Sequence, residues 1–341
     1  MKPSKKDISN PLISKGKPKL GIFFLPFSII NPEEEGSKFT RFLSIGHHFK
    51  SESVVIIDEE YVLFMMLIDV PLWNGTLFAL LDKGTKRTFS STIKAGLKEV
   101  KFSPNVKTDA ESYQKSKKFL SSFRTSFEKS EAIIEGYSEN GLPFDFHFDL
   151  FGKKAFSAVS SKLDGSSLVL FQSDYFRSQG FLNLSSHEFR VSENSLAFVS
   201  RVDGSLPKVK KIESLILSFF DKDNKPLTLV LSSLPNDGFN FLKSEGKTFF
   251  IIDPASFSLL KGYTQKDGTI IPTKIKVESS KMGLLFVEDD EKKLEAKRLG
   301  VFDFATLIRF GTVSGNLTLV DGRTFEFNGS SAIIQENVDS K

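Results

Sequence analysis

The segment FDFHFDL, residues 144–150, concentrates groups that could bind a metal or move a proton. Alternate residues of a β-strand point to opposite faces. One face would carry Asp145, His147 and Asp149. The other would carry Phe144, Phe146 and Phe148. Histidine flanked by carboxylates suits zinc, manganese or iron. Any half-buried strand shows the same alternation, however, so we favour a solvated or barrel-lining polar face without a metal.

Asp69 is the second candidate for chemistry, because it ends the very apolar run YVLFMMLID, residues 61–69. A carboxylate in such a place needs hydrogen-bond donors or takes a raised pKa. Asp69 and His147 are therefore the candidate catalytic acid or base. The alternative for Asp69, which we favour, is a strand-end carboxylate that accepts hydrogen bonds from nearby backbone amides.

Several classes of site are excluded by what the sequence lacks. It has no cysteine, which rules out disulfides, thiol nucleophiles, Cys-ligated zinc and iron–sulfur clusters. The G-x-G-x-x-G, Walker, H-E-x-x-H and G-x-S-x-G motifs are absent as well. No basic and aromatic surface for nucleic acid can be recognised. We therefore predict no cofactor and no nucleic-acid partner, and the sequence identifies no partner protein.

The net charge of +4 arises from the N-terminus, where residues 1–19 contain six lysines and one aspartate. We predict a disordered basic tail over residues 1–19. The apolar run LGIFFLPFSII, residues 20–30, is too short to span a bilayer and contains a proline. We expect no transmembrane segment and a cytoplasmic location, with export to the cell envelope as the alternative.

Asx-Gly pairs recur along the chain and suggest the turns of an antiparallel meander. Such pairs begin at Asn74, Asn140, Asp164, Asp203, Asp237, Asp267, Asp321 and Asn328. Evidence for helix is thin. The best candidate follows Thr108-Asp109, where Phe119, Phe123 and Phe127 have helical spacing, but this segment fits a curved strand equally well.

The clearest hairpin lies near the C-terminal end, in RFGTVSGNLTLVDGRTFEFNGSSA, residues 309–332. A two-residue loop at Asp321-Gly322 would place the leucines of one strand and the phenylalanines of the other on opposite faces. An odd-numbered loop places them together, and register follows the buried face. We therefore predict a three-residue loop with Gly322 at positive φ, as in a G1 bulge.

The expected fold is mainly β: two antiparallel barrels or curved sheets in tandem, with little helix. A join near residues 202–210 divides the chain into an N-terminal domain over residues 20–205 and a C-terminal domain over residues 206–341. The sequence also contains 36 phenylalanines, against five tyrosines and one tryptophan. They indicate either an aromatic cavity for an apolar ligand or, as we favour, a Phe-rich core.

Three segments resemble a bacterial and fungal family of unknown function that is related in architecture to the tandem lipocalin-like carotenoid hydratases. They are RFGTVSGNLTLVDGRTFEFNGSSAIIQE, DEEYVLFMMLIDVPLWNGTLFALLD and NSLAFVSRVDGSLP. The resemblance implies the tandem barrel fold. The family typically carries Asp, Arg and Trp where this chain has Ser200, Asp203 and Leu206. The resemblance therefore implies a fold more firmly than an activity.

These observations leave three hypotheses for function. The leading one is a soluble lipocalin-like protein that binds an apolar molecule, such as a lipid or isoprenoid, against Phe144, Phe146 and Phe148. The second is a hydratase or isomerase that uses Asp69 or His147 for acid catalysis on an unsaturated apolar substrate. The third is a structural or interaction protein with closed interiors. Whether the protein is an enzyme stays open at this stage.

Overall fold

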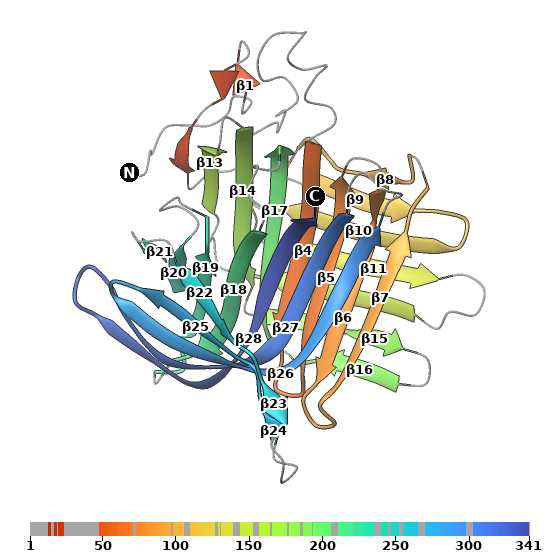
Figure 1. Ribbon diagram of the computed structural model, residues 1–341. Coiled ribbons are helices and arrows are strands. Elements are labelled where there is room, and N and C mark those ends of the chain that lie inside the picture. The colour runs from red at the N-terminus through yellow and green to blue at the C-terminus, as the bar shows by residue number, and fades with distance from the viewer. Residues whose placement is uncertain are drawn as a thin grey trace. The chain divides into compact units, whose positions relative to one another are not determined.

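The computed structural model shows an all-β protein in which none of the described residues is helical (Figure 1). The structure describes residues 13–14, 17–18, 20–23, 48–70, 73–96, 98–105, 110–126, 129, 131–138, 144–152, 157–163, 166–175, 177–184, 187–192, 194–205, 211–221, 223–234, 240–244, 247–251, 255–264, 270–297 and 303–340. The strands pair in antiparallel fashion, which confirms the predicted fold class. Among these residues no helix is long and apolar enough to cross a membrane.

The chain forms two compact units, which are described separately. The first unit contains Met1–Asp58, Phe64–Phe78 and Ser91–Val209, and the second contains Glu59–Leu63, Ala79–Ser90 and Lys210–Lys341. The predicted domain boundary after residue 205 adjoins residues 206–210, which lie outside the described residues. Most of the predicted basic tail also lies outside them. Its described part is one short pair, β1 (Ile13–Ser14) with β2 (Lys17–Pro18).

Two large sheets contribute to the first unit. The order in the eight-stranded sheet is β3 (Gly21–Phe23), β13 (Ser157–Leu163), β14 (Ser166–Tyr175), β17 (Leu196–Ser205), β4 (His48–Ile57), β5 (Tyr61–Val70), β6 (Trp73–Asp82) and β7 (Arg87–Lys94). The order in the seven-stranded sheet is β16 (His187–Val191), β15 (Arg177–Leu184), β12 (Phe144–Phe151), β11 (Glu131–Ser138), β10 (Phe119–Ser126), β9 (Ala110–Lys115) and β8 (Val100–Lys101).

Side chains from these two sheets meet inside the first unit. The hydroxyl of Thr125 in β10 donates a hydrogen bond to Glu52 in β4 at 3.0 Å. The hydroxyl of Thr76 in β6 donates one to Gln114 in β9 at 2.7 Å. The faces that carry these residues are therefore the inner faces of the two sheets, and the interior of the first unit lies between them.

The segment that was equally consistent with helix and strand forms β9 and β10. Phe119 and Phe123 both lie on the buried face of β10. Residues four positions apart share a face in a strand as they do in a helix, so this spacing could not separate the two structures. Phe127 lies outside the described residues.

The second unit is built around a nine-stranded sheet that Figure 1 shows to be strongly curled. Its order is β21 (Lys247–Phe250), β20 (Phe241–Ser244), β19 (Pro226–Ser232), β18 (Lys211–Phe220), β28 (Thr324–Ser340), β27 (Asp303–Thr318), β26 (Met282–Lys297), β25 (Lys274–Ser279) and β22 (Ser256–Leu260). Leu229 and Leu242, near one edge, share a core cluster with Val277, near the other. The curl brings them together, and bulges in β26 and β28 add curvature. A separate pair joins β23 (Tyr263–Thr264) to β24 (Ile270–Ile271).

The hairpin between β27 and β28 has the predicted turn. The amide of Leu319 donates to the carbonyl of Arg323 at 2.8 Å, and the amide of Gly322 donates to the carbonyl of Leu319 at 3.0 Å. These bonds close a three-residue loop with Gly322 at φ 86°. Leu317 lies opposite Phe325, and both belong to or pack on the same core. The buried face therefore selects the loop length, as expected.

Not every Asx-Gly pair marks a turn. Asn74-Gly75 lies within β6 and Asp203-Gly204 lies within β17. Gly329 occupies a bulge in β28, with φ 72°. At these positions glycine allows an irregular backbone within a strand. An Asx-Gly pair in the sequence does not distinguish this irregularity from a turn.

Candidate functional site

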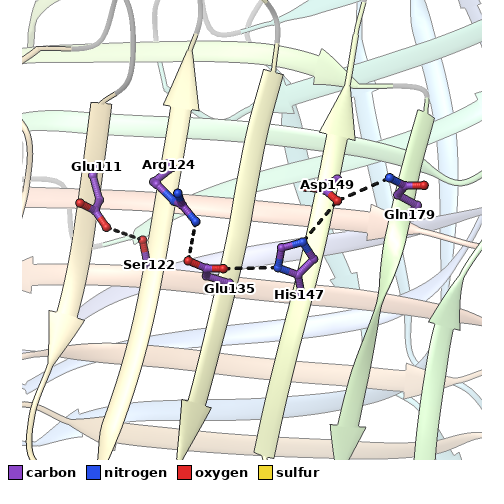
Figure 2. Close-up of polar contacts among 7 residues, drawn as sticks. All are labelled: Glu111, Ser122, Arg124, Glu135, His147, Asp149 and Gln179. Atoms are coloured by element: carbon purple, nitrogen blue, oxygen red, sulfur yellow. Dashed lines mark hydrogen bonds and ion pairs between the residues drawn. The ribbon is translucent and has the colours of Figure 1, made fainter.

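Polar side chains cross the outer face of the seven-stranded sheet (Figure 2). We call Arg124, Glu135, His147 and Asp149 the outer ladder. The His147 ring contacts Glu135 through Nδ1 at 3.4 Å and Asp149 through Nε2 at 3.2 Å. The Glu135 carboxylate also forms an ion pair with Arg124, which lies on the other neighbouring strand, β10. Register explains the central contact, since Glu135 in β11 lies directly opposite His147 in β12.

The outer ladder is in contact with solvent. The His147 side chain is 37% exposed, and its ring contacts Glu135 and Asp149, while Arg124 forms an ion pair with Glu135. Among the residues that the structure describes, no group of three or more His, Cys, Asp or Glu side chains could hold a metal ion. Asp145 lies on the same face of β12 as His147 and Asp149.

The opposite face of β12 forms an aromatic wall inside the first unit. Phe146 and Phe148 are 2% and 0% exposed, and their ring centroids lie 6.0 Å apart. Each lies directly opposite a glycine on a neighbouring strand, Gly136 for Phe146 and Gly180 for Phe148. A Cβ at Gly136 would come within 2.4 Å of the Phe146 ring, so the glycine makes room for it. The side chain of Phe144 lies outside the described part of the structure.

Four charged side chains occupy the inner face of the eight-stranded sheet. We call Lys50, Glu52, Arg201 and Asp203 the charged quartet. Register places Lys50 opposite Asp203 and Glu52 opposite Arg201, so that the charges alternate both along β4 and β17 and between them. Glu52 is 0%, Arg201 1% and Asp203 0% exposed. Such groups are rarely buried unless they are paired.

The partners of the charged quartet leave part of its hydrogen-bonding capacity unused. Arg201 donates from Nη2 to Asp203 at 3.3 Å, and its guanidinium lies 5.6 Å from the centroid of the Phe102 ring. Lys50 lies 4.0 Å from Oδ1 of Asp203. Within the described part of the chain, no hydrogen-bond partner reaches Oε2 of Glu52, Nε and Nη1 of Arg201, or Oδ1 of Asp203. Buried polar atoms normally have a hydrogen-bond partner, either in the protein or in an ordered water.

Burial raises the pKa values of the carboxyl groups around the charged quartet. For Glu52, burial raises the pKa, while the charge of Arg201 and the hydroxyls of Ser112 and Thr125 oppose that rise. For Asp203, burial likewise raises the pKa, against the effect of Lys50 and Arg201. These carboxyls therefore keep a proton at a higher pH than they would in water.

Asp69 lies next to the charged quartet. Burial raises its pKa most, Lys50 lowers it, and Asp203 raises it further. His147, the other catalytic candidate, lies on the outer face of the other sheet of the first unit. The structure therefore brings Asp69 together with Lys50 and Asp203, and it does not bring Asp69 together with His147.

Sequence reasoning missed Glu52, Arg201 and Lys50 as site residues, and it noted Asp203 only in other contexts. The available signal was weak. Each strand has two charges of opposite sign, two residues apart, beside a run of buried apolar residues. Only the pairing of β4 with β17, strands about 150 residues apart, assembles them.

Comparisons with known proteins identify the fold. No family model and no curated protein matches the chain. Among solved structures, an AttH-type protein of Nitrosomonas europaea matches with a TM-score of 0.54 and 12% identity, over 96% of this chain and 98% of that one. Kievitone hydratase of Nectria haematococca matches with 0.51 and 13%, over 87% and 90%. CghA with Sch210972 matches with 0.50 and 10%, over 86% and 89%. At these identities the similarity is one of fold.

Proposed function

We propose that this protein binds an apolar small molecule, lipid-like or isoprenoid-like, in the interior of its first unit. One observation carries the proposal: fully buried charged side chains with unpartnered atoms occupy an inner face whose opposing sheet carries the aromatic wall. In a core that fills itself, a buried charge without full hydrogen bonding costs several kcal/mol. The polar group of a bound molecule would supply hydrogen bonds to some of those atoms. The lipocalin-like fold supports the same proposal, because barrels of this kind can hold one small ligand.

Native mass spectrometry of the protein purified from its source cells tests this directly. We expect an additional mass that is lost on denaturation in organic solvent and whose extract is rich in hydrocarbon. Displacement of an environment-sensitive fluorophore by added lipids gives a second measurement. A protein that carries no extra mass and binds no apolar probe would contradict the proposal.

Neighbouring positions of β12 provide a matched pair of variants. Phe148→Ser removes part of the aromatic wall, whereas His147→Ser changes the outer ladder on the other face of the same strand. We expect the first to weaken probe binding and the second to leave it unchanged. Near-ultraviolet circular dichroism checks that both fold, and Phe148→Leu retains the apolar surface if Phe148→Ser does not fold.

A second candidate function is acid catalysis of the hydratase or isomerase type on an unsaturated apolar substrate. It is favoured by Asp69, whose pKa burial raises, as a catalytic acid requires. The name of kievitone hydratase, one of the structural neighbours, is consistent with it. If Asp69 donates its proton to one carbon of the double bond, the reaction in D₂O forms a C–D bond there, and the resulting cation takes up water in a hydratase or loses a proton from a neighbouring carbon in an isomerase. Asp69→Asn would abolish this incorporation of deuterium. Equal deuterium content with and without Asp69 would eliminate this candidate.

A further inference from the structure

We infer that a pocket in the second unit binds a small carboxylate whose apolar part is a single ring. The pocket has a volume of about 220 Å³. It lies where three segments meet: Phe250 and Ile251 at the end of β21, Ser279 and Lys281 at the turn between β25 and β26, and residues 318–320 at the loop between β27 and β28. All of these residues belong to the second unit, so the inference goes beyond the proposed function, which concerns the first unit.

Backbone hydrogen bonds hold the walls of this pocket in place. The amide of Thr318 donates to the carbonyl of Lys281 at 3.0 Å, which joins one turn to the other. The amide of Ile251 donates to the carbonyl of Asn240 at 2.8 Å. The loop that contains Gly322 is closed by its own two hydrogen bonds. A ligand therefore meets walls that are already ordered, which lowers the entropic cost of binding.

The pocket offers an apolar surface that is open to a ligand. Ile251 and Leu319 belong to the core cluster of the second unit and form the base of the pocket, with 6% of each exposed. Phe250 is half-buried, and Val320 is 62% exposed in a loop, where small polar residues, glycine and proline predominate. A bound ring would cover Val320 and the accessible part of Phe250.

The volume of the pocket limits the size of the ligand. An apolar cavity of about 150 Å³ is large enough to bind benzene. Pockets for drug-sized ligands have volumes of about 300–1,000 Å³. The 220 Å³ of this pocket therefore suits one ring with a short side arm, and a long hydrocarbon chain would extend beyond it.

Lys281 determines the charge that the ligand should carry. Among the described residues that line the pocket it alone is charged, and its side chain is exposed. In the described part of the chain no carboxylate forms an ion pair with it. Asp321, which follows Val320 in the chain, is bound instead by Arg323 through two hydrogen bonds of 2.9 and 2.6 Å. Lys281 is thus available to a carboxylate, and a single cation matches its single negative charge.

The test compares three probes that share a phenyl ring and differ at the head: phenylacetate, phenethyl alcohol and phenethylammonium. Each is titrated into the full-length protein with labelled Ile, Leu and Val methyl groups and followed by NMR. We expect phenylacetate to shift the methyl signals of Ile251, Leu319 and Val320. It should bind about tenfold more tightly than phenethylammonium, because Lys281 attracts one charge and repels the other. Acetate, which has no ring to bury, should bind at least about tenfold more weakly than phenylacetate.

Variants at exposed positions separate the contributions of charge and apolar surface. Lys281→Gln should reduce the preference for phenylacetate over phenethylammonium to about twofold or less, and Lys281→Glu should reverse it. Lys276→Gln is the matched control, since it changes an exposed lysine of β25 that does not line the pocket. Val320→Ser should weaken phenylacetate by about threefold and leave the preference unchanged. Circular dichroism checks that all four variants fold.

The outcomes separate this inference from the proposed function. Equal binding of the three probes, or a preference that survives Lys281→Glu, would overturn the inference. Signals that shift at Ile134, which lies opposite Phe148 on the aromatic wall, and not at Ile251 or Leu319, would place the probe in the first unit and overturn it as well. If phenylacetate shifts none of these signals, the inference is wrong while the proposed function stands. If the first unit carries no apolar ligand, binding at Lys281 is still expected.

Discussion

The outer ladder and the charged quartet are built in the same way and differ in their surroundings. In both, side chains of opposite charge lie beside each other on adjacent antiparallel strands, Arg124 beside Glu135 in the ladder and Arg201 beside Glu52 in the quartet. Members of the outer ladder are partly exposed, and water can complete their hydrogen bonds. Three members of the quartet are buried, and several of their atoms have no partner among the described residues. Location, and not the arrangement of charges, therefore separates a solvated sheet face from a candidate site.

The energetic consequences differ accordingly. Exposed ion pairs contribute about 0–1 kcal/mol, because water screens them and their side chains lose entropy. A buried pair is expensive to desolvate, and removal of one partner exposes the remaining charge to the full penalty. Buried charges with perturbed pKa values occur more often at functional sites than on solvated sheet faces, which makes the quartet the better candidate for the proposed binding site.

The largest expected effect is that of Arg201→Met, which removes a buried cation and leaves Glu52 and Asp203 without it. We expect the free energy of unfolding to fall by about 3–5 kcal/mol, as for other broken buried pairs. Urea denaturation followed by circular dichroism measures it. Arg124→Met, at the outer ladder, is the matched control. If Arg201→Met lowers the free energy of unfolding no more than Arg124→Met does, the proposed difference between the quartet and the ladder is wrong.

A double variant tests whether Glu52 and Arg201 act as a pair. Glu52→Leu with Arg201→Met replaces both charges by apolar groups, which often restores stability. We expect the double variant to be less destabilised than the sum of the single variants by about 2 kcal/mol. The four proteins of this cycle are compared by urea denaturation at one pH. Strict additivity would show that the two side chains do not interact.

The sequence predicted the fold better than the site, for a physical reason. Alternation and turn residues are local signals. The loop at Gly322 followed from which residues of the hairpin must be buried. Two members of the outer ladder, His147 and Asp149, were visible because they alternate within one short segment. The quartet depends on the pairing of β4 with β17, which local patterns do not specify. Asp69 was found because a single carboxylate ended an apolar run.

The pH dependence of stability provides the third test. In the folded protein the pKa of Glu52 is raised above its ordinary value of 4.5 by burial, against Arg201, Ser112 and Thr125. The folded state therefore holds a proton that the unfolded state releases. The proton on Glu52 therefore stabilises the folded state. This stabilisation is complete below about pH 4.5 and is lost as the pH rises through the folded-state pKa, with a slope of up to about 1.4 kcal/mol per pH unit.

Glu52→Gln removes that titration, so the variant serves as its own reference. The stability of the wild-type protein relative to Glu52→Gln should decrease as the pH rises from about 4.5 through the folded-state pKa of Glu52. Urea denaturation of both proteins across that range measures the difference, in which the titration of other groups cancels. If the difference in stability stays constant, or if the wild-type protein becomes more stable relative to Glu52→Gln as the pH rises, Glu52 does not have a raised pKa in the folded state.

The smallest effect belongs to the outer ladder. Glu135→Gln removes the carboxylate that Arg124 and His147 share, but both side chains can turn to water. We expect a loss of only about 0.2–1 kcal/mol at low salt, and less in about 1 M NaCl, because salt screens exposed charges. The same salt should leave the loss at Arg201→Met nearly unchanged, because buried charges are screened much less. A ladder loss as large as that of the quartet, or one that salt does not reduce, would mean that the outer face is covered by another molecule and that the contrast between the two clusters does not hold.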